Sequence, residues 1–309
     1  MHSLCYLIEV IVATPSPSQK PVFSLPKLIA NLAYHAMSVE VYLTPKPGLV
    51  DKRNNGSHHD MNLDLFVASA DAIAPYMERF VIAGRASAKQ SVTELLQRLR
   101  PIGQEAERVM LRATHGVNTH KGMIFNLGLI CGAVGWLEAK QLKVDTLHIK
   151  EVIRQSCEGL VYDELKARVE LPAATAGERI YQQFGISGAR GEAASGMATV
   201  MNYALPTYQE CLRASCSEED ALLRTLLIIM ANNDDTNVVS RGGIEGLRFL
   251  QNHASQILEN TSIRDHNIKT ELIKFDQELI ARNLSPGGAA DLLASTWLIH
   301  EIVQLFTKK

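Results

Sequence analysis

The chain has 309 residues, of which 46% are hydrophobic and 21% are charged, and its 31 Lys and Arg residues nearly balance its 33 Asp and Glu residues. A chain of this length can bury a sizeable core, either as one large domain or as two ordinary ones. The formal net charge of -2 excludes the broad basic excess that is typical of nucleic-acid-binding proteins, so we expect no nucleic-acid partner and only a local anion site.

The N-terminal residues predict an extension rather than a folded element. The apolar run 4–13 has no basic residue before it and is interrupted by Glu9, so we interpret it as neither a signal peptide nor a membrane anchor. Prolines are frequent in residues 14–26, where they favour an extended backbone and remove amide donors. We therefore expect residues 1–26 to form a proline-rich tether and residues 27–309 to form the folded domain.

From residue 28 onward, apolar residues recur at spacings of three and four, which is the period of an amphipathic helix. No alternating pattern typical of a strand interrupts them. The stripes cover residues 28–41, 63–77, 91–113, 120–137, 147–166, 175–184, 190–204, 218–231, 243–260, 269–282 and 287–307. The sequence therefore predicts an all-α protein with a single compact, multi-helix, bundle-like domain.

The most apolar stretch, residues 122–137, predicts a buried core helix. It is shorter than the roughly 20 residues that a bilayer span needs, and it contains Asn126. Gly128 and Gly132 are four residues apart, a spacing that lets a neighbouring helix approach closely. The five cysteines form no CxxC pair, so we expect neither disulfides nor a structural zinc site. The expected location is the cytoplasm, without membrane association.

The first unusual loop, residues 40–61, combines prolines and glycine with charged and imidazole side chains. One interpretation is a solvated turn between two helices. However, long ordered loops in compact domains tend to be functional. The candidate functional residues of this loop are Glu40, Lys46, Asp51, Arg53, His58 and Asp60.

A second loop, residues 114–122, brings Asn118, His120 and Lys121 to the start of the predicted helix 120–137. The free amides and the positive dipole end of a helix N-terminus favour an anion. Asn118 or Thr119 can cap this helix. The alternative is a capped helix that carries an ordinary surface lysine.

A third loop, residues 231–243, places Asp234 and Asp235 directly after a strongly apolar helix and ahead of Arg241. Adjacent carboxylates repel one another unless they are solvated or lie beside cations. Mg²⁺ prefers carboxylate oxygens together with retained waters and substrate phosphates. We favour metal or substrate binding here over a simple polar helix end.

A fourth loop, residues 282–291, predicts a helix start at Ser285 and the proline after it. Gly287 and Gly288 in the first turn each cost about 1 kcal/mol of helix stability relative to alanine, so a close approach of some group should require them. Either a ligand oxyanion or a tight helix crossing would explain them. Asp291 is either a carboxylate ligand or a charge at the helix start.

Five strings together resemble the triphosphoribosyl-dephospho-CoA synthase family, in order, from about residue 28 to the C-terminus. They are EVYLTPKPGLVDKRNNGSHHDM (40–61), GVNTHKGMIFNLGLICGA (116–133), YQQFGISGARGEA (181–193), NNDDTNVVSRGG (232–243) and RNLSPGGAADLL (282–293). Asp234 departs from the family, in which a less charged residue is expected, so Asp235 is the safer carboxylate. The 181–193 string and RPIG (100–103) are most similar to the citrate lyase branch of the family rather than the malonate decarboxylase branch.

The resemblance implies a pentosyltransferase that moves the 5-triphosphoribosyl group of ATP to the 2'-hydroxyl of 3'-dephospho-CoA and releases adenine. The product is the precursor of the prosthetic group of the citrate lyase acyl carrier protein and is passed to a holo-acyl-carrier-protein synthase. Three alternatives stay open: the same reaction for malonate decarboxylase, a Mg²⁺-dependent helical nucleotide glycohydrolase, and a non-catalytic nucleotide-binding protein. The sequence also leaves a homodimer open.

Cleavage of an N-glycosidic bond passes through a sugar with oxocarbenium character, so the site needs a carboxylate near C1, a base and a proton donor. The candidate catalytic residues are Asp235, Asp60, Asp51, His58 and His120. The candidate substrate-binding residues are Lys46, Arg53, Asn118, Lys121, Arg190, Arg241, Ser285, Gly287 and Gly288. Arg190, together with Glu192, is the candidate for dephospho-CoA, although such a pair often forms only on the surface. Mg²⁺ is expected on Asp235, Glu40 and Asp234.

Overall fold

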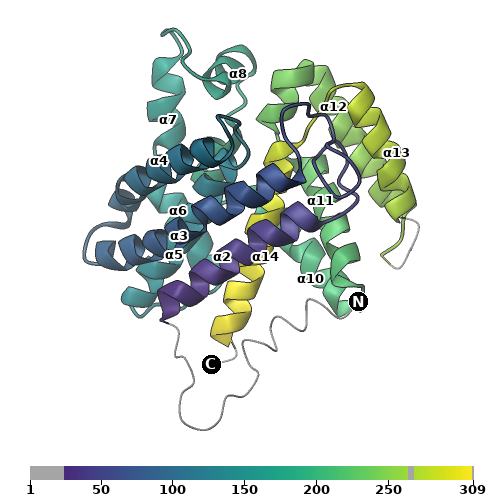
Figure 1. The fold of residues 1–309 in the computed structure, drawn as a ribbon. Helices are drawn as coiled ribbons and strands as arrows, with labels where there is room; N and C mark the ends of the chain where they lie inside the picture. The colour runs from purple at the N-terminus through teal and green to yellow at the C-terminus, as the bar shows by residue number, and fades with distance from the viewer. Residues whose placement is uncertain (1–23, 264–267, 308–309) are drawn as a thin grey trace.

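The computed structural model describes residues 24–263 and 268–307, which are helical and contain no strand (Figure 1). The all-α prediction is therefore confirmed. The helices are α2 (Leu25–Tyr42), α3 (Leu63–Ser87), η1 (Val92–Glu94), α4 (Leu95–Ala113), α5 (Lys121–Ala139), α6 (Thr146–Ser156), α7 (Leu160–Glu164), η2 (Lys166–Arg168), α8 (Ala176–Phe184), α9 (Gly188–Ala194), η3 (Val200–Ala204), α10 (Leu205–Arg213), α11 (Glu218–Asn232), α12 (Thr236–Asn260), α13 (Ile268–Ala281) and α14 (Gly287–Thr307).

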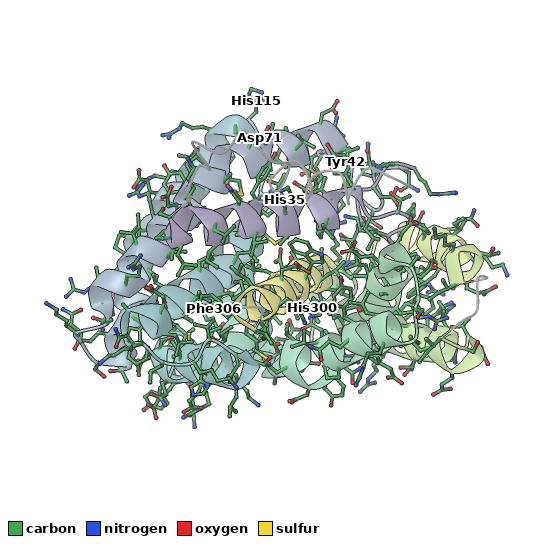
Figure 2. The ribbon with its side chains drawn as sticks, turned by 90° about the horizontal axis from the view of Figure 1, so that it is seen from below. His35, Tyr42, Asp71, His115, His300 and Phe306 are labelled. Carbon is green, nitrogen blue, oxygen red and sulfur yellow. The ribbon has the colours of Figure 1, made fainter. Side chains whose placement is uncertain are left out.

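Helix α14 runs through the middle of the molecule. In Figure 1 it lies behind α2, with α3 to α9 on one side and α10 to α13 on the other. It packs against α2, α5 and α11, and His300 and Phe306 mark its course below α2 in Figure 2. Nearly every side chain from Ala289 to Ile299 is buried. The start of α14 therefore lies inside the protein, where several loops can reach it.

Helices α3 and α5 touch through their backbones. A Cβ atom on Gly84 would lie 2.0 Å from the carbonyl oxygen of Gly132, so neither helix could approach so closely with a side chain at residue 84. This confirms the close crossing predicted at Gly132, whereas Gly128 makes room for the Phe80 ring. α5 is long and apolar enough to cross a membrane, but it is mostly buried in the protein, as predicted for a core helix.

Several predicted helix boundaries were wrong, because apolar periodicity does not reveal where a single residue changes the direction of the backbone. The stripe 147–166 is broken at Gly159, which has a φ of 81°. The stripe 190–204 is broken at Gly196 and continues past residue 204 into α10. α12 begins well before residue 243 and bends at Gly243, where φ is 62° and ψ is -165°.

At the N-terminus, α2 begins at Leu25, with Pro26 in its first turn, where a missing amide donor costs nothing. The last residues of the predicted tether are therefore helical. Residues 1–23, the rest of that tether, lie outside the described residues.

Candidate active site

The four loops singled out above meet at the buried start of α14, where two cavities adjoin. The large cavity measures about 610 Å³ and the small cavity about 210 Å³. The large cavity is lined by apolar side chains of α3, α4 and α5, by α9 and by residues 233–237. The small cavity is lined by the loop that follows α2, by residues 118–123 and by Arg241. The residues that line both are Asn118, Lys121, Gly122, Asn237 and Asp291. Distant polar segments therefore share one site, as the sequence analysis predicts.

Asp291 lies on the boundary of the two cavities, and its carboxylate has no hydrogen-bond or ion-pair partner among the described residues. Burial raises the pKa of Asp291 well above its usual value, and the negative charges of Glu40 and Asp235 raise it further. A Cβ atom on Gly122 would lie 2.0 Å from Asp291 Oδ2, so this glycine is needed for the carboxylate to reach its position. The structure thus favours the ligand interpretation of Asp291 and adds Gly122, which the sequence did not indicate as a functional residue.

Asp235 joins the starts of two helices. Its Oδ1 accepts a hydrogen bond from the Asn237 amide of α12 at 2.9 Å, and its Oδ2 accepts one from the Ala289 amide of α14 at 2.9 Å. A Cβ atom on Gly288 would lie 2.9 Å from Oδ2, and one on Gly287 would lie 2.9 Å from Asn237 Nδ2. The two glycines therefore serve a tight crossing of helix starts. Burial raises the pKa of Asp235 to about 6, although its amide donors favour the charged form.

Asp235→Ala is expected to lower the free energy of unfolding by about 2 kcal/mol, because it leaves amides at two helix starts without an acceptor. Urea unfolding measures this change. Asp234 is the matched control, because its side chain is exposed and caps no helix. Asp234→Ala should stay within about 0.5 kcal/mol of the parent, and equal effects of the two substitutions would contradict the capping role.

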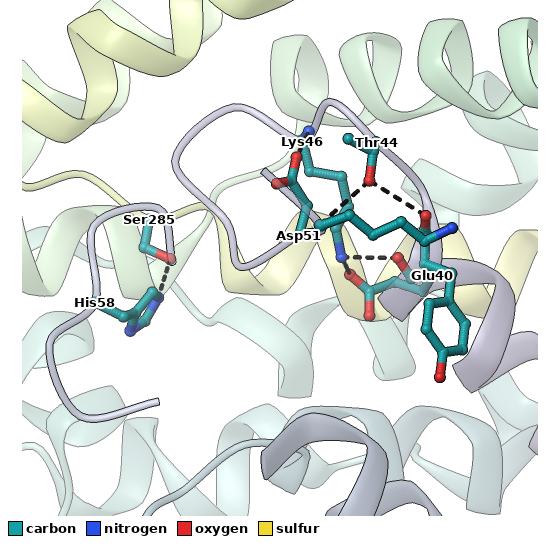
Figure 3. Close-up of polar contacts among 8 residues, drawn as sticks. Glu40, Thr44, Lys46, Asp51, His58 and Ser285 are labelled. Atoms are coloured by element: carbon teal, nitrogen blue, oxygen red, sulfur yellow. Dashed lines mark hydrogen bonds and ion pairs between the residues drawn. The ribbon is translucent and has the colours of Figure 1, made fainter. Parts of the chain in front are cut away.

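Lys46 and Glu40 form a buried ion pair, with Nζ 2.5 Å from Glu40 Oε1 and 2.7 Å from the Glu40 carbonyl oxygen (Figure 3). Both side chains are only 2–3% exposed and both border the small cavity. Most of the Lys46 charge is therefore neutralised within the protein before any substrate arrives.

Three predicted residues of the loop 40–61 do not line either cavity. Asp51 accepts hydrogen bonds from the amides of Lys46, Arg53 and Asn54, so its carboxylate holds the loop in shape (Figure 3 labels Asp51). The side chains of Arg53 and Asp60 are exposed. We therefore withdraw Asp51 and Asp60 as catalytic groups and Arg53 as a triphosphate ligand.

Both predicted histidines border the small cavity, but neither is a cation near neutral pH. Burial and the positive charge of Arg241 lower the pKa of His58 to about 4. Burial and Lys46 lower the pKa of His120 to about 3. Both imidazoles are therefore uncharged near neutral pH because of their surroundings.

His120→Gln is expected to gain about 2 kcal/mol of stability relative to the parent when the pH falls from 7 to 5. The folded-state pKa of His120 lies below its ordinary value of 6.5, so below pH 6.5 only the unfolded parent takes up this proton. The parent loses that stability on acidification, whereas glutamine does not titrate. Urea unfolding at both pH values measures the difference, and a constant difference would mean that His120 titrates alike in both states.

The remaining polar candidates border the cavities with partners of their own. Asn118 Oδ1 accepts from the Lys121 amide at 3.2 Å, but the N-cap residue of α5 is His120, so the predicted capping of this helix by Asn118 or Thr119 is wrong. Lys121 Nζ lies 2.5 Å from Glu107 Oε1. Arg190 pairs with Glu164 at 2.7 Å and not with Glu192.

The Glu192 carboxylate instead accepts hydrogen bonds from Thr199 and Val200, so the alternative of a simple surface pair between Arg190 and Glu192 is wrong, and their role toward dephospho-CoA stays a prediction. Arg190 still lines the large cavity, where the side chain that it meets is Glu164.

The predicted metal ligands do not form a cluster. Within the described ranges, no group of three or more His, Cys, Asp or Glu side chains is arranged to hold a metal ion. Asp234 and Asp235 border the large cavity, whereas Glu40 borders the small one. Any divalent cation would therefore need further ligands from a substrate.

Comparisons with known proteins agree in pointing to one family. Residues 26–309 match a family model described as ATP:dephospho-CoA triphosphoribosyl transferase. The chain is 59% identical over 304 residues to a "Probable 2-(5''-triphosphoribosyl)-3'-dephosphocoenzyme-A synthase" of Vibrio cholerae serotype O1, which covers 98% of the chain and 97% of the relative. It is 51% identical over 266 residues to the 2-(5''-triphosphoribosyl)-3'-dephosphocoenzyme-A synthase of Pectobacterium atrosepticum, and this alignment covers 86% of the chain and 86% of the relative. No solved structure matches the chain.

Proposed function

Because the chain belongs to the ATP:dephospho-CoA triphosphoribosyl transferase family, we propose that it transfers the 5-triphosphoribosyl group of ATP to the 2'-hydroxyl of 3'-dephospho-CoA and releases adenine. The chain is a transferase, and its substrates are ATP and dephospho-CoA. The family match covers nearly all of the folded part of the chain, and the printed names of the relatives state the product of this reaction.

The observation that best supports this reaction is the unpaired carboxylate of Asp291 between two cavities. Two nucleotide substrates can meet there from different sides. In the reaction the bond from ribose C1 to adenine N9 breaks, and a bond from C1 to the 2'-oxygen of dephospho-CoA forms. Adenine takes up a proton and the attacking hydroxyl loses one.

We assign Asp291 the role of the carboxylate that faces the ribose. Its negative charge stabilises the positive charge that develops on the sugar as adenine leaves. Its raised pKa also makes it a better acceptor for the proton of the 2'-hydroxyl than an ordinary carboxylate. Asp235, the first choice from sequence, has both oxygens engaged by amides and is better explained as a helix cap.

The donor set fits Mg²⁺, which typically uses one or two carboxylates together with waters and substrate phosphates. Because Asp291 is assigned to the ribose and amides engage both oxygens of Asp235, we propose that the ATP phosphates and waters would supply most of the Mg²⁺ ligands, with at most one carboxylate of the site. When bound, the ion would neutralise part of the triphosphate charge.

The test is to incubate the purified protein with ATP, Mg²⁺ and dephospho-CoA. We expect adenine in the supernatant and a dephospho-CoA species that is heavier by one triphosphoribosyl group, both detected by chromatography and mass spectrometry. Without dephospho-CoA, adenine release should stop. Release of free ribose triphosphate under that condition would favour the glycohydrolase, and absence of any turnover would favour a non-catalytic protein.

We also propose that the product serves citrate lyase and is passed to a holo-acyl-carrier-protein synthase. The supporting observation is that both strings similar to the citrate lyase branch border the large cavity, through Arg100, Gly103 and Arg190. In cells without this chain, the citrate lyase acyl carrier protein should lack its prosthetic group by mass spectrometry. An unmodified malonate decarboxylase carrier instead would assign the chain to the other branch. The cytoplasmic location and the homodimer stay predictions.

A further inference from the structure

Two short hydrogen-bond relays end at the small cavity, and the proposed reaction assigns no task to either. In the first, Thr119 Oγ1 donates to Ser69 Oγ at 2.7 Å, and Ser69 Oγ lies 2.7 Å from His120 Nδ1. We assign the Ser69 proton to Nδ1, because no other acceptor for this hydroxyl lies among the described residues. A neutral imidazole that accepts at Nδ1 carries its proton at Nε2.

His120 Nε2 is therefore a donor, and it is buried with no partner in the part of the chain that the structure describes. His120 is 1% exposed and borders the small cavity. An N–H group left in this way keeps a desolvation penalty, which a ligand oxygen would remove by accepting the hydrogen bond.

The second relay runs from Arg241 through the His58 imidazole to the Ser285 hydroxyl, so here the hydroxyl and not the imidazole faces the cavity. Arg241 Nη2 lies 3.2 Å from His58 Nδ1, and because a guanidinium only donates, Nδ1 is again the acceptor. His58 Nε2–H then donates to Ser285 Oγ at 2.7 Å, the contact drawn in Figure 3. The Ser285 hydroxyl proton has no acceptor among the described side chains and carbonyls, so it is available to a group in the small cavity.

We propose that the small cavity holds the triphosphate of ATP through two fixed neutral donors, His120 Nε2–H and the Ser285 hydroxyl, which the two relays orient. Lys46, Lys121 and Arg241 line the same cavity, where Lys46 is paired with Glu40 and Lys121 with Glu107, so their N–H groups add donors to its wall. Phosphate oxygens only accept hydrogen bonds, so they match a wall of donors and cations. The inference rests on the proposed function, in which ATP is a substrate.

Ser69 is the new positioning residue in this proposal. It lies on α3, outside every string that resembles the family, and it does not line the cavity. Its hydroxyl nevertheless decides which nitrogen of His120 carries the proton. Thr119 in turn sets the direction of the Ser69 hydroxyl.

The experiment measures the binding of inorganic tripolyphosphate to the full chain by calorimetry, together with ¹⁵N NMR of its histidines. In the free protein, His58 and His120 should both be protonated at Nε2, and tripolyphosphate should shift the His120 Nε2 resonance. Ser69→Ala and Ser285→Ala should each weaken tripolyphosphate binding by about tenfold, which corresponds to about 1.4 kcal/mol. Both should raise the KM for ATP and leave the KM for dephospho-CoA unchanged.

Two comparisons separate a positioning role from general damage. Ser87→Ala is the matched control, because Ser87 is a buried serine of α3 that bonds only to the Ala83 carbonyl oxygen. It should bind tripolyphosphate like the parent. His120→Gln keeps an N–H near the Nε2 position and should bind better than His120→Asn, whose shorter amide cannot reach it.

Protonation of His120 at Nδ1, or tripolyphosphate binding that is the same in Ser69→Ala, Ser285→Ala and the parent, would overturn the proposal even if adenine transfer is observed. Conversely, if tripolyphosphate binds as expected but no adenine transfer is observed, the proposed function would be refuted and the proposed triphosphate-binding site would stand.

Discussion

Asp291→Asn is expected to lower the rate of adenine release by at least about 10²-fold while the folded protein becomes more stable at neutral pH. The loss of rate follows because asparagine cannot stabilise positive charge on the ribose or accept the proton of the attacking hydroxyl. The gain of stability follows because the carboxylate is half-buried at the cavity boundary, has no partner among the described residues and lies near the charges of Glu40 and Asp235. Steady-state kinetics and urea unfolding at pH 7 measure the two effects.

The pH dependence of that stability gain identifies its cause. The folded-state pKa of Asp291 is raised above its ordinary value of 3.8, so ionisation of this group costs stability as the pH rises above 3.8. The advantage of Asp291→Asn should therefore be small at pH 4 and should grow toward pH 7. A variant that is inactive and also less stable than the parent at pH 7 would instead show that Asp291 supports the fold.

Gly122→Ala is a second approach to the same carboxylate, because it leaves the chemistry of Asp291 unchanged. The added methyl group would occupy the position of Asp291 Oδ2 and push the carboxylate away from the cavity boundary. If Gly122→Ala and Asp291→Asn lower the rate of adenine release to a comparable extent in steady-state kinetics, the position of the carboxylate matters as well as its charge.

The sequence predicts the helices of this protein well because most of them bury one periodic face. Periodicity places α2, α4 and α5 to within a few residues, and it places the start of α3 but ends that helix at residue 77 instead of Ser87. It fails where one residue redirects the chain without ending the apolar pattern, as Gly159 does between α6 and α7. It also misses the early start of α12, which depends on the Asp235 cap rather than on apolar spacing.

The composition of the site was only partly predictable. The sequence indicates which loops matter, because unusual prolines, glycines and charges concentrate in them. It cannot indicate which carboxylate stays unpaired, because that depends on amides far away in the chain. Asp235 lies in a polar loop of the sequence, yet the amides of Asn237 and Ala289 engage its carboxylate, whereas Asp291, near the start of an apolar helix, meets no donor among the described residues.

Lys46→Met is expected to lower the free energy of unfolding by about 3–5 kcal/mol, because it leaves the Glu40 carboxylate buried without its cation. Both side chains are almost completely removed from water, and Nζ also binds the last turn of α2 through the Glu40 carbonyl oxygen. The loop after α2, which forms a wall of the small cavity, would lose its anchor. Urea unfolding at pH 7 measures the cost.

The double variant Lys46→Met/Glu40→Gln distinguishes a desolvated pair from a general packing defect. If Lys46→Met destabilises the protein because the Glu40 carboxylate stays charged and unpaired, then neutralising Glu40 should restore most of the lost free energy of unfolding. The effects of the two substitutions on stability should then be strongly non-additive. Tripolyphosphate binding should stay weak in the double variant, because the N–H donors of Lys46 Nζ are still missing from the wall of the small cavity. Additive losses of stability would mean that the two side chains contribute through packing alone. Recovery of stability without recovery of anion binding would assign Lys46 two separate tasks, holding the loop and attracting the triphosphate.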